Sequence, residues 1–394
     1  MPGPVIVDVL LVVLLVGSVF SGYRSGLLRS AAVIAGVILG AAAAYFVVPL
    51  VGIWVSAAEW RTAATLAAAI LLVIAGLTLG QNVGHAIRRR AGRSRLRVVD
   101  RVLGAIATVV ASALAISMLA FSLGSLGVPG LSPAIASSRV VQAINGATPE
   151  QVQRFLAQLR SAAIDDGLPR VVEAFTGAAP QIPEVQTGTA ALRQAAQSVV
   201  RITGNAYACG QNQSGSGFIA ATDRVVTNAH VVAGVAQPVV EVPGGQAVQG
   251  EVVYFDPVDD LAVIAAPGLG APPLEVAGTS LTVGAQAVTD GYPFGGPFDS
   301  DPAQVIAVGP QLVADIYGAS PTARVVYTLA ADVEHGESGG PLLSEGGLVA
   351  GVVFAKAAET SNVGYALAME EVQPVIAQAA ALSAPVSSGE CVGG

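Results

Sequence analysis

Three short segments in the second half of the chain combine the residue types that hydrolyse acyl bonds. His230 stands at the end of an apolar, β-branched run, Asp260 opens another such run, and Ser338 lies among glycines in the segment Gly336–Pro341. A serine hydroxyl becomes a nucleophile at neutral pH when a base removes its proton, and a carboxylate can hold a histidine base in the required tautomer. The three residues therefore predict a nucleophile, a general base and an orienting acid, in the chain order His, Asp, Ser.

The glycines around Ser338 predict an oxyanion hole. Such a hole needs backbone N–H groups that converge on one point, and glycine adopts the loop geometry without a Cβ penalty. We expect the N–H groups of Gly336 and Ser338 to be the donors, each lowering the barrier by about 3 kcal/mol. His335 shares this loop and is therefore not expected to be the base; it either senses pH or covers the loop.

The elements that must position these residues are short strands. From Leu192 onward, β-branched runs are separated by Gly, Pro and Asp, and no strand–helix–strand alternation is visible. This pattern favours an antiparallel barrel architecture over a parallel sheet. The ten predicted strands are Val199–Ile202, Ser216–Ala220, Arg224–Thr227, Val239–Val242, Glu251–Phe255, Leu261–Ala265, Ala285–Thr289, Val305–Val308, Val325–Leu329 and Leu348–Phe354.

The three motifs resemble those of chymotrypsin-fold serine proteases of the trypsin and HtrA-like bacterial type. Thr227–His230 matches T-x-A-H, Asp260–Ala262 matches D-[IL]-A, and Gly336–Pro341 matches G-[DN]-S-G-G-P. The resemblance covers residues 192–391 and implies an all-β fold of two six-stranded barrels with the triad at their interface. Glu337 departs from the pattern, which has Asp or Asn there, so an incompletely formed oxyanion hole is an alternative.

The same resemblance implies a specificity pocket beside the nucleophile. Asp332, six residues before Ser338, stands where trypsin-like enzymes line this pocket. A carboxylate there would recruit Arg or Lys before the scissile bond, or it could point into the fold. Gly364, Tyr365 and Ala366 are the other residues that the resemblance assigns to the pocket.

The composition separates an apolar front from an acidic rear. Of the 394 residues, 53% are apolar and 12% are charged, and the mean hydropathy is +0.65. Residues 1–126 hold 10 basic and 3 acidic side chains, a net charge of +7, and the remainder holds 9 and 24, a net charge of −15. An acidic rear repels nucleic acid, so nucleic-acid binding is set aside. Two cysteines outside any metal-ligand spacing and the lack of a phosphate-cradling motif predict no metal and no cofactor.

Four uncharged stretches in the front part predict a four-helix transmembrane domain over residues 1–128, since a helix needs about 20 apolar residues to cross a bilayer. They run near Val9–Tyr23, Ser30–Ala58, Thr62–Ile87 and Val102–Val128. Arginines concentrate in the loops after the first and third stretches, which predicts that these loops face the cytoplasm and that the rear lies outside the cell membrane. Two G-x-x-x-G motifs, Gly36–Gly40 and Gly76–Gly80, predict close helix packing.

The segment Asp8–Leu27 resembles the four-span colicin V production family. In an oxidising compartment outside the membrane, Cys209 and Cys391 could form a disulfide. With four spans in front and this cysteine pair, the whole chain resembles the membrane-anchored periplasmic serine proteases of the mycobacterial acid-resistance type. That resemblance implies an inner-membrane enzyme that cleaves envelope proteins or peptides under acid stress.

Residues 129–190 predict a helical, Pro-rich linker in front of a protease domain at 191–394. One helix opens at Pro149–Glu150 with Thr148 placed to cap it, and a second short helix is expected over Leu168–Phe175. The segment Gly177–Pro183 is predicted to be a protease-sensitive joint, where self-cleavage is possible.

Two further functions stay open at this point. A catalytically impaired, peptide-binding sensor would follow if Glu337 spoils the oxyanion hole. A transport or secretion component gated by the extracytoplasmic domain would follow if the four spans carry the activity.

Overall fold

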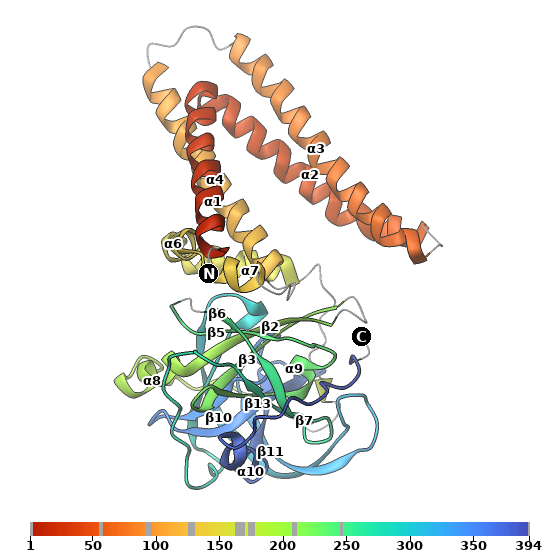
Figure 1. Cartoon of the computed structure of the whole chain (residues 1–394), viewed down its shortest axis with the longest axis vertical. Helices are drawn as coiled ribbons and strands as arrows, with labels where there is room; N and C mark the ends of the chain where they lie inside the picture. The colour runs from red at the N-terminus through yellow and green to blue at the C-terminus, as the bar shows by residue number, and fades with distance from the viewer. Residues whose placement is uncertain are drawn as a thin grey trace. The chain divides into compact units, whose positions relative to one another are not determined.

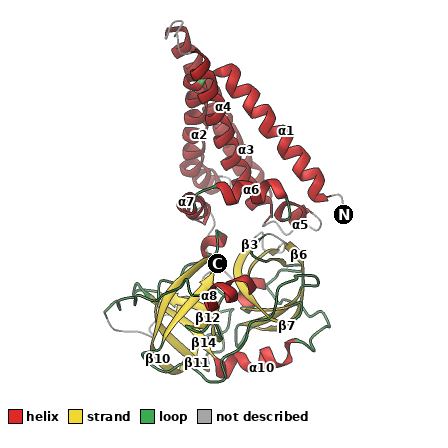
Figure 2. Cartoon of the chain, turned by 90° about the vertical axis from the view of Figure 1, so that its left-hand side faces the viewer, coloured by secondary structure: helices red, strands yellow, loops and turns green. Residues whose placement is uncertain are grey.

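The computed structural model of the chain describes residues 3–54, 58–90, 97–124, 131–161, 170–171, 178–206, 211–244 and 247–392. Helices make up the first part of the chain and strands most of the last part (Figures 1 and 2). The chain divides into a helical unit, Val5–Leu119, and a second unit that contains Met1–Pro4 and Ala120–Gly394.

The helical unit is built from four long helices: α1 (Gly3–Ser25), α2 (Leu27–Trp54), α3 (Ala58–Arg90) and α4 (Arg97–Gly124). In the described part of the chain, three stretches are long and apolar enough to cross a membrane: Gly3–Ser25, Leu27–Ala44 and Val98–Ala120. The third predicted span lies in α3, whose apolar stretch Ile70–Ala86 falls short of that length. Apolar helices at the N-terminus are therefore confirmed, and a fourth span is not.

The glycine motifs bring α2 and α3 into backbone contact, as predicted. A Cβ placed on Gly36 would lie 2.3 Å from the carbonyl oxygen of Gly76, and one placed on Gly76 would lie 2.2 Å from the carbonyl oxygen of Gly36. Side chains larger than hydrogen would push the helices apart. Small residues at this crossing are needed because packing, rather than the hydrophobic effect, holds helices together in lipid.

Three shorter helices follow in the second unit: α5 (Leu131–Ala136), α6 (Arg139–Ala147) and α7 (Glu150–Ser161). The helix predicted from Pro149–Glu150 is confirmed as α7. Thr148 was expected to cap its start, but Thr148 instead ends α6, where its hydroxyl donates to the Ile144 carbonyl at 2.7 Å. Helix α7 packs on the strand-rich part of the unit, since Arg154 forms a 2.9 Å ion pair with Asp299 and a Cβ on Gly296 would meet Ala157 at 2.8 Å.

The helix predicted over Leu168–Phe175 is wrong where the structure describes it. Arg170–Val171 form a short strand, β1, which pairs in parallel with the end of β13 (Val349–Ala357). The other residues of that prediction lie outside the described ranges. A strand of two residues forms because it pairs with the open edge of another strand. The local sequence pattern does not show such long-range pairing.

The strands form two antiparallel sheets with seven members each, β1 being the one parallel addition. The first sheet, in spatial order, comprises β6 (Ala247–Gln249), β5 (Val239–Glu241), β2 (Val199–Ala206), β3 (Gln211–Ala221), β4 (Arg224–Thr227), β8 (Leu261–Ala265) and β7 (Glu251–Asp256). The second comprises β1, β13, β12 (Pro341–Ser344), β9 (Gln286–Gly291), β10 (Asp299–Val313), β11 (Thr322–Ala330) and β14 (Val363–Ala368).

Pairing between β13 and β14 closes six strands of the second sheet into a ring, with β1 outside it. The first sheet has no closing pair among its described residues. Two closed six-stranded barrels are therefore not confirmed, although the β-rich architecture is. All ten predicted strands are present, most of them within shifted limits, and β1, β6, β12 and β14 are additional.

A shared apolar core joins the two sheets. Phe218 and Leu261 from the first sheet belong to one buried cluster with Tyr365 and Leu367 from the second. The helices α8 (Ala190–Ala195) and α10 (Met369–Ala379) contribute to the same cluster. Because both sheets bury their inner faces against each other, loops from each are held rigidly at the boundary between them.

Candidate active site

His230 and Asp260 form the best-defined polar contact of the site. His230 lies on the short helix α9 (Ala229–Val232), directly after β4, and Asp260 immediately precedes β8. The imidazole Nδ1 lies 2.8 Å and 3.0 Å from the two carboxylate oxygens of Asp260, and the backbone N–H of His230 donates to the same carboxylate at 3.0 Å. This arrangement places the proton on Nδ1 and leaves Nε2 to act as a base.

The turn before β8 explains why Asp260, and neither neighbouring aspartate, faces the histidine. Asp256 accepts the backbone N–H groups of Val258 and Asp259 at 2.9 and 3.1 Å, which makes it the turn-forming residue. Asp260 has a φ of +54°, a left-handed conformation that Asp tolerates better than most residues. The side-chain amide of Asn228 donates to the Asp260 carbonyl at 2.8 Å and so supports this conformation.

Ser338 lies on the loop between β11 and β12, directly against the histidine segment. A Cβ on Gly339 would come within 2.2 Å of the Thr227 hydroxyl and 3.0 Å of the Asn228 backbone nitrogen, and Gly339 itself has a φ of +83°. Only glycine permits this approach, because any side chain would displace the segment that carries His230. The structure therefore brings the predicted nucleophile loop and the predicted base segment together.

Ser216 on β3 links the two segments, and sequence reasoning missed its role. Its N–H donates to the Ser338 carbonyl at 2.8 Å, its hydroxyl donates to the Gly336 carbonyl at 2.7 Å, and its own carbonyl accepts the Thr227 hydroxyl at 2.7 Å. The surrounding segment, Gly215–Gly217, is rich in small residues, a weak signal that many strands share. Nothing in the sequence singles out the serine.

The Ser338 hydroxyl points to a backbone carbonyl rather than to His230. Ser338 Oγ lies 3.5 Å from the Phe354 carbonyl oxygen, and no hydrogen bond joins it to His230 within the described structure. Catalytic hydrogen bonds of unliganded enzymes are often long and tighten when substrate binds. Rotation of Ser338 about χ1 to another staggered rotamer redirects the hydroxyl without moving the backbone.

The two predicted oxyanion donors are free to bind a ligand atom. Neither the N–H of Gly336 nor that of Ser338 donates to an acceptor among the described residues, whereas the N–H of Glu337 donates to Glu334 at 3.1 Å. Gly336 has a φ of +96°, and a Cβ there would lie 2.4 Å from the Tyr292 carbonyl oxygen. The backbone geometry thus needs the glycine that the motif supplies.

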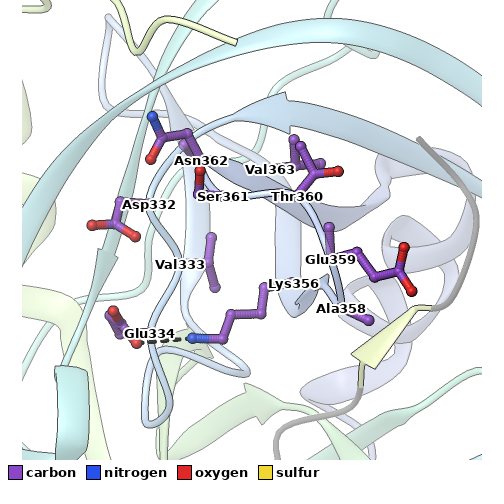
Figure 3. A pocket seen from close by; sticks show the side chains of 12 residues that line it. Asp332, Val333, Glu334, Lys356, Ala358, Glu359, Thr360, Ser361, Asn362 and Val363 are labelled. Carbon is purple, nitrogen blue, oxygen red and sulfur yellow. Dashed lines mark hydrogen bonds and ion pairs between the residues drawn. The ribbon is translucent and has the colours of Figure 1, made fainter. Parts of the chain in front are cut away.

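A cavity of about 270 Å³ lies beside the serine loop (Figure 3). Asp332 and Glu334 line one wall, and Lys356 lines another, with a 3.0 Å ion pair between Glu334 and Lys356. Asp332 therefore lies at the wall of a cavity, and its role in specificity stays a prediction. Gly364, Tyr365 and Ala366 do not line this cavity; they are buried in β14, and the adjacent Val363 reaches the cavity instead.

Glu337 is a buried carboxyl group with the charges of Asp301 and Asp299 near it. Glu337 is 1% exposed and accepts the Glu334 N–H at 2.6 Å, and a Cβ on Gly291 would lie 3.1 Å from its Cα. Burial raises the pKa of Glu337 well above its usual range. Burial, followed by the charge of Asp299, raises the pKa of Asp301 to about 6, and burial raises the pKa of Asp290 to about 7.

These raised pKa values predict that the second unit is more stable in acid than at alkaline pH. Unfolded carboxyls titrate near 4, so the folded state binds extra protons until the pH passes about 6 for Asp301 and about 7 for Asp290. The stabilisation is complete at low pH and is lost as the pH rises through these values. Replacing Asp290 with Asn should raise the melting temperature at pH 8 and change it little at pH 5. Differential scanning calorimetry of the full chain in detergent measures this.

The matched control is Glu345→Gln, which neutralises an exposed carboxylate on the same unit. This variant should melt like the parent at both pH values. Because the Asn side chain can still accept the 2.6 Å hydrogen bond from Ser300, the Asp290 variant isolates the charge. A melting temperature of the parent that rises from pH 5 to pH 8 would contradict the assignment of buried protons to this cluster.

Two protein families match the chain, one in its apolar front part and one in its acidic rear part. Residues 7–149 match the colicin V production protein family, and residues 215–352 match the trypsin-like peptidase domain family. The chain is 35% identical over 379 residues to serine protease Rv3671c of Mycobacterium tuberculosis, which covers 94% of this chain and 95% of that protein. The chain belongs to the Rv3671c family of serine proteases.

A solved structure agrees with this membership. The active form of the Rv3671c protease from M. tuberculosis superposes with a TM-score of 0.52 at 38% identity, over 57% of this chain and all of that one. The putative serine protease HhoB of Synechocystis is 32% identical over 164 residues, 41% of this chain and 39% of HhoB. The chain is therefore a serine protease with a trypsin-like β domain behind apolar helices, as the sequence motifs predicted.

Proposed function

We propose that the chain is a membrane-anchored serine endopeptidase in which Ser338 is the nucleophile, His230 the general base and Asp260 the residue that orients it. The observation that supports this most is the bidentate contact between His230 Nδ1 and the Asp260 carboxylate, beside a serine loop packed against the same segment. Cell-envelope proteins or peptides are the proposed substrates.

In the proposed reaction His230 takes up a proton and then releases it, first as the acyl-enzyme forms and again as water hydrolyses it. His230 Nε2 removes the hydroxyl proton as Ser338 Oγ bonds to the substrate carbonyl carbon. The N–H groups of Gly336 and Ser338 donate hydrogen bonds to the carbonyl oxygen as it becomes negatively charged. The imidazolium then gives its proton to the leaving amine as the C–N bond breaks. Water, deprotonated by His230, attacks the acyl-enzyme and releases Ser338 with its proton restored.

A fluorophosphonate probe tests this proposal. The probe forms a bond to a serine oxygen only when a base activates the hydroxyl, so we expect one label on the full-length chain and none on Ser338→Ala. The competing function is a peptide-binding sensor, which the contact between the Ser338 hydroxyl and the Phe354 carbonyl favours. An intact chain that binds peptides but takes no label at any pH from 5 to 8 would select the sensor.

For the membrane part we propose four spans, with the arginine-rich loops in the cytoplasm and the protease on the periplasmic side. Three described stretches have the required length, and the arginines cluster in two of the three connecting loops. We further propose boundaries at 1–128, 129–190 and 191–394, and a second closed barrel from the first sheet. A transport function would instead predict a flux that persists in Ser338→Ala and disappears when residues 1–126 are removed.

A disulfide between Cys209 and Cys391 is part of the proposal for the periplasmic compartment. Cys209 lies outside the described residues; Cys391 is not a free thiol, and its Sγ lies 2.9 Å from the Cβ position of Gly234, four residues after His230. Tyr317 accepts the N–H of Glu390 at 3.1 Å and so holds the same tail. The periplasmic compartment is oxidising, which favours the disulfide. We further propose that the enzyme acts under acid stress and that it can cleave itself within the linker.

For specificity we propose that Asp332 recruits a basic residue before the scissile bond. Asp332 is exposed on the wall of the cavity beside the serine loop. A peptide-library profile should show enrichment of Arg and Lys that disappears in Asp332→Asn. A profile that lacks a basic preference in the parent would refute this assignment.

A further inference from the structure

One edge of β13 runs past the nucleophile and is open to an added strand. Along this edge, Val353 exchanges backbone hydrogen bonds with Gly339 and Gly340 at 2.8 and 2.9 Å, and the carbonyl of Phe354 faces the Ser338 hydroxyl. The partner β12 pairs with β13 only as far as Val352. Backbone groups beyond Phe354 are thus positioned to receive an extended peptide beside the active serine.

The chain's own linker occupies the far end of this edge. Strand β1 pairs with β13 in the register Arg170↔Lys356 and Val171↔Ala357. Figure 3 shows it as a short pale-yellow arrow beside Ala358, at the rim of the cavity. The first paired position, Lys356, is two positions beyond Phe354, which is about 7 Å along a strand.

A second contact holds the linker near the same cavity. The side-chain amide of Asn362, which lines the cavity, donates to the Pro180 carbonyl at 3.4 Å. Val185, a little further along the linker, packs against the main core. The linker therefore contacts the cavity rim at Ala357 and again at Asn362, on both sides of the loop that forms this wall.

We propose that the segment Arg170–Val171 is an autoinhibitory strand that competes with peptide substrates for the open edge of β13. This inference rests on the proposed protease function. The segment runs parallel to β13 and pairs beyond Phe354, so it covers the edge without placing a peptide bond at Ser338. Because it is tethered, its effective concentration at the edge is high, and substrates must displace it. Removing the linker from the edge raises activity.

Proline substitutions test the proposal on the full-length, uncut chain in detergent. Adjacent N–H groups of a strand point to opposite edges, so one of Arg170→Pro and Val171→Pro must remove a donor toward β13. We expect that variant to raise kcat/KM for a fluorogenic peptide about fivefold, the gain from losing one net backbone hydrogen bond. Ala178→Pro, at an exposed and unpaired linker position, should leave the rate unchanged.

A synthetic peptide spanning Gly167–Phe175 provides a second measurement. It should inhibit the activated variant competitively, and the same peptide carrying the proline substitution that activates the full chain should not. Unchanged kcat/KM in both proline variants, or equal inhibition by the two peptides, would overturn the proposal. Fluorophosphonate labelling of each variant separates this failure from failure of the protease function, because labelled but unaltered variants refute only the autoinhibitory strand.

Discussion

Ser338→Ala should lower kcat/KM for a peptide substrate by about 10⁶, to the level left when a serine protease loses its nucleophile. The loss is this large because no other group can form the acyl-enzyme, while the oxyanion donors and the substrate edge remain. The substitution removes one oxygen from a residue that is 2% exposed, and the backbone bonds of the loop to Ser216 and Val353 do not involve it. Initial rates of the full-length variant measure the effect.

The melting temperature of this variant serves as its control. An unchanged melting temperature with lost activity assigns the effect to chemistry. Ser216→Ala is a useful contrast, since it removes a hydroxyl that donates to the Gly336 carbonyl and accepts the Tyr292 N–H at 2.9 Å. That variant should lose both stability and activity, because the loop then loses its support. Full activity of Ser338→Ala would refute the nucleophile assignment.

Asp260→Asn should lower kcat by about 10⁴ with little change in KM. An amide at this position can present its NH₂ group to His230 Nδ1, which stabilises the tautomer that protonates Nε2 and so disables the base. Asn also tolerates the left-handed backbone of residue 260, so the fold should survive. Steady-state kinetics at pH 7 to 10 measure the loss, which should shrink as the pH rises and hydroxide assists.

Asp259→Asn is the matched control one residue earlier. Asp259 does not touch His230, and burial followed by the charge of Asp256 raises its pKa. Its replacement should change kcat less than threefold, a small effect compared with the triad. Equal losses in the two variants would show that the whole acidic turn, rather than the one carboxylate, supports catalysis.

The prediction of the active site from the sequence depended on short local motifs. His230, Asp260 and Ser338 could be predicted because each lies at a strand end or in a loop and has a distinctive neighbour, such as the small residue before the histidine and the glycines around the serine. The strand pattern likewise predicted the β architecture, since β-branched runs between turn residues are a local property. The family comparisons and the coordinates agree with that part of the prediction.

What the sequence could not predict depends on long-range contacts. Ser216 acquires its role from bonds to residues 120 positions away, and β1 exists only because β13 offers an open edge. Thr148 was predicted to cap the start of one helix, yet it ends another, because only two residues separate the two helices. Gly364 and Tyr365, which the resemblance assigns to a specificity pocket, are buried in β14 and do not line the cavity beside Asp332, so their assignment stays a prediction.

The most direct test of the triad is a crystal structure of the chain with a fluorophosphonate bound covalently. The account predicts phosphorus on Ser338 Oγ, the phosphonyl oxygen about 2.7–3.1 Å from the N–H groups of both Gly336 and Ser338, and His230 Nε2 turned toward the leaving-group side. An adduct on another residue would contradict it. So would an adduct whose oxygen points away from the Gly336 N–H while His230 remains out of reach.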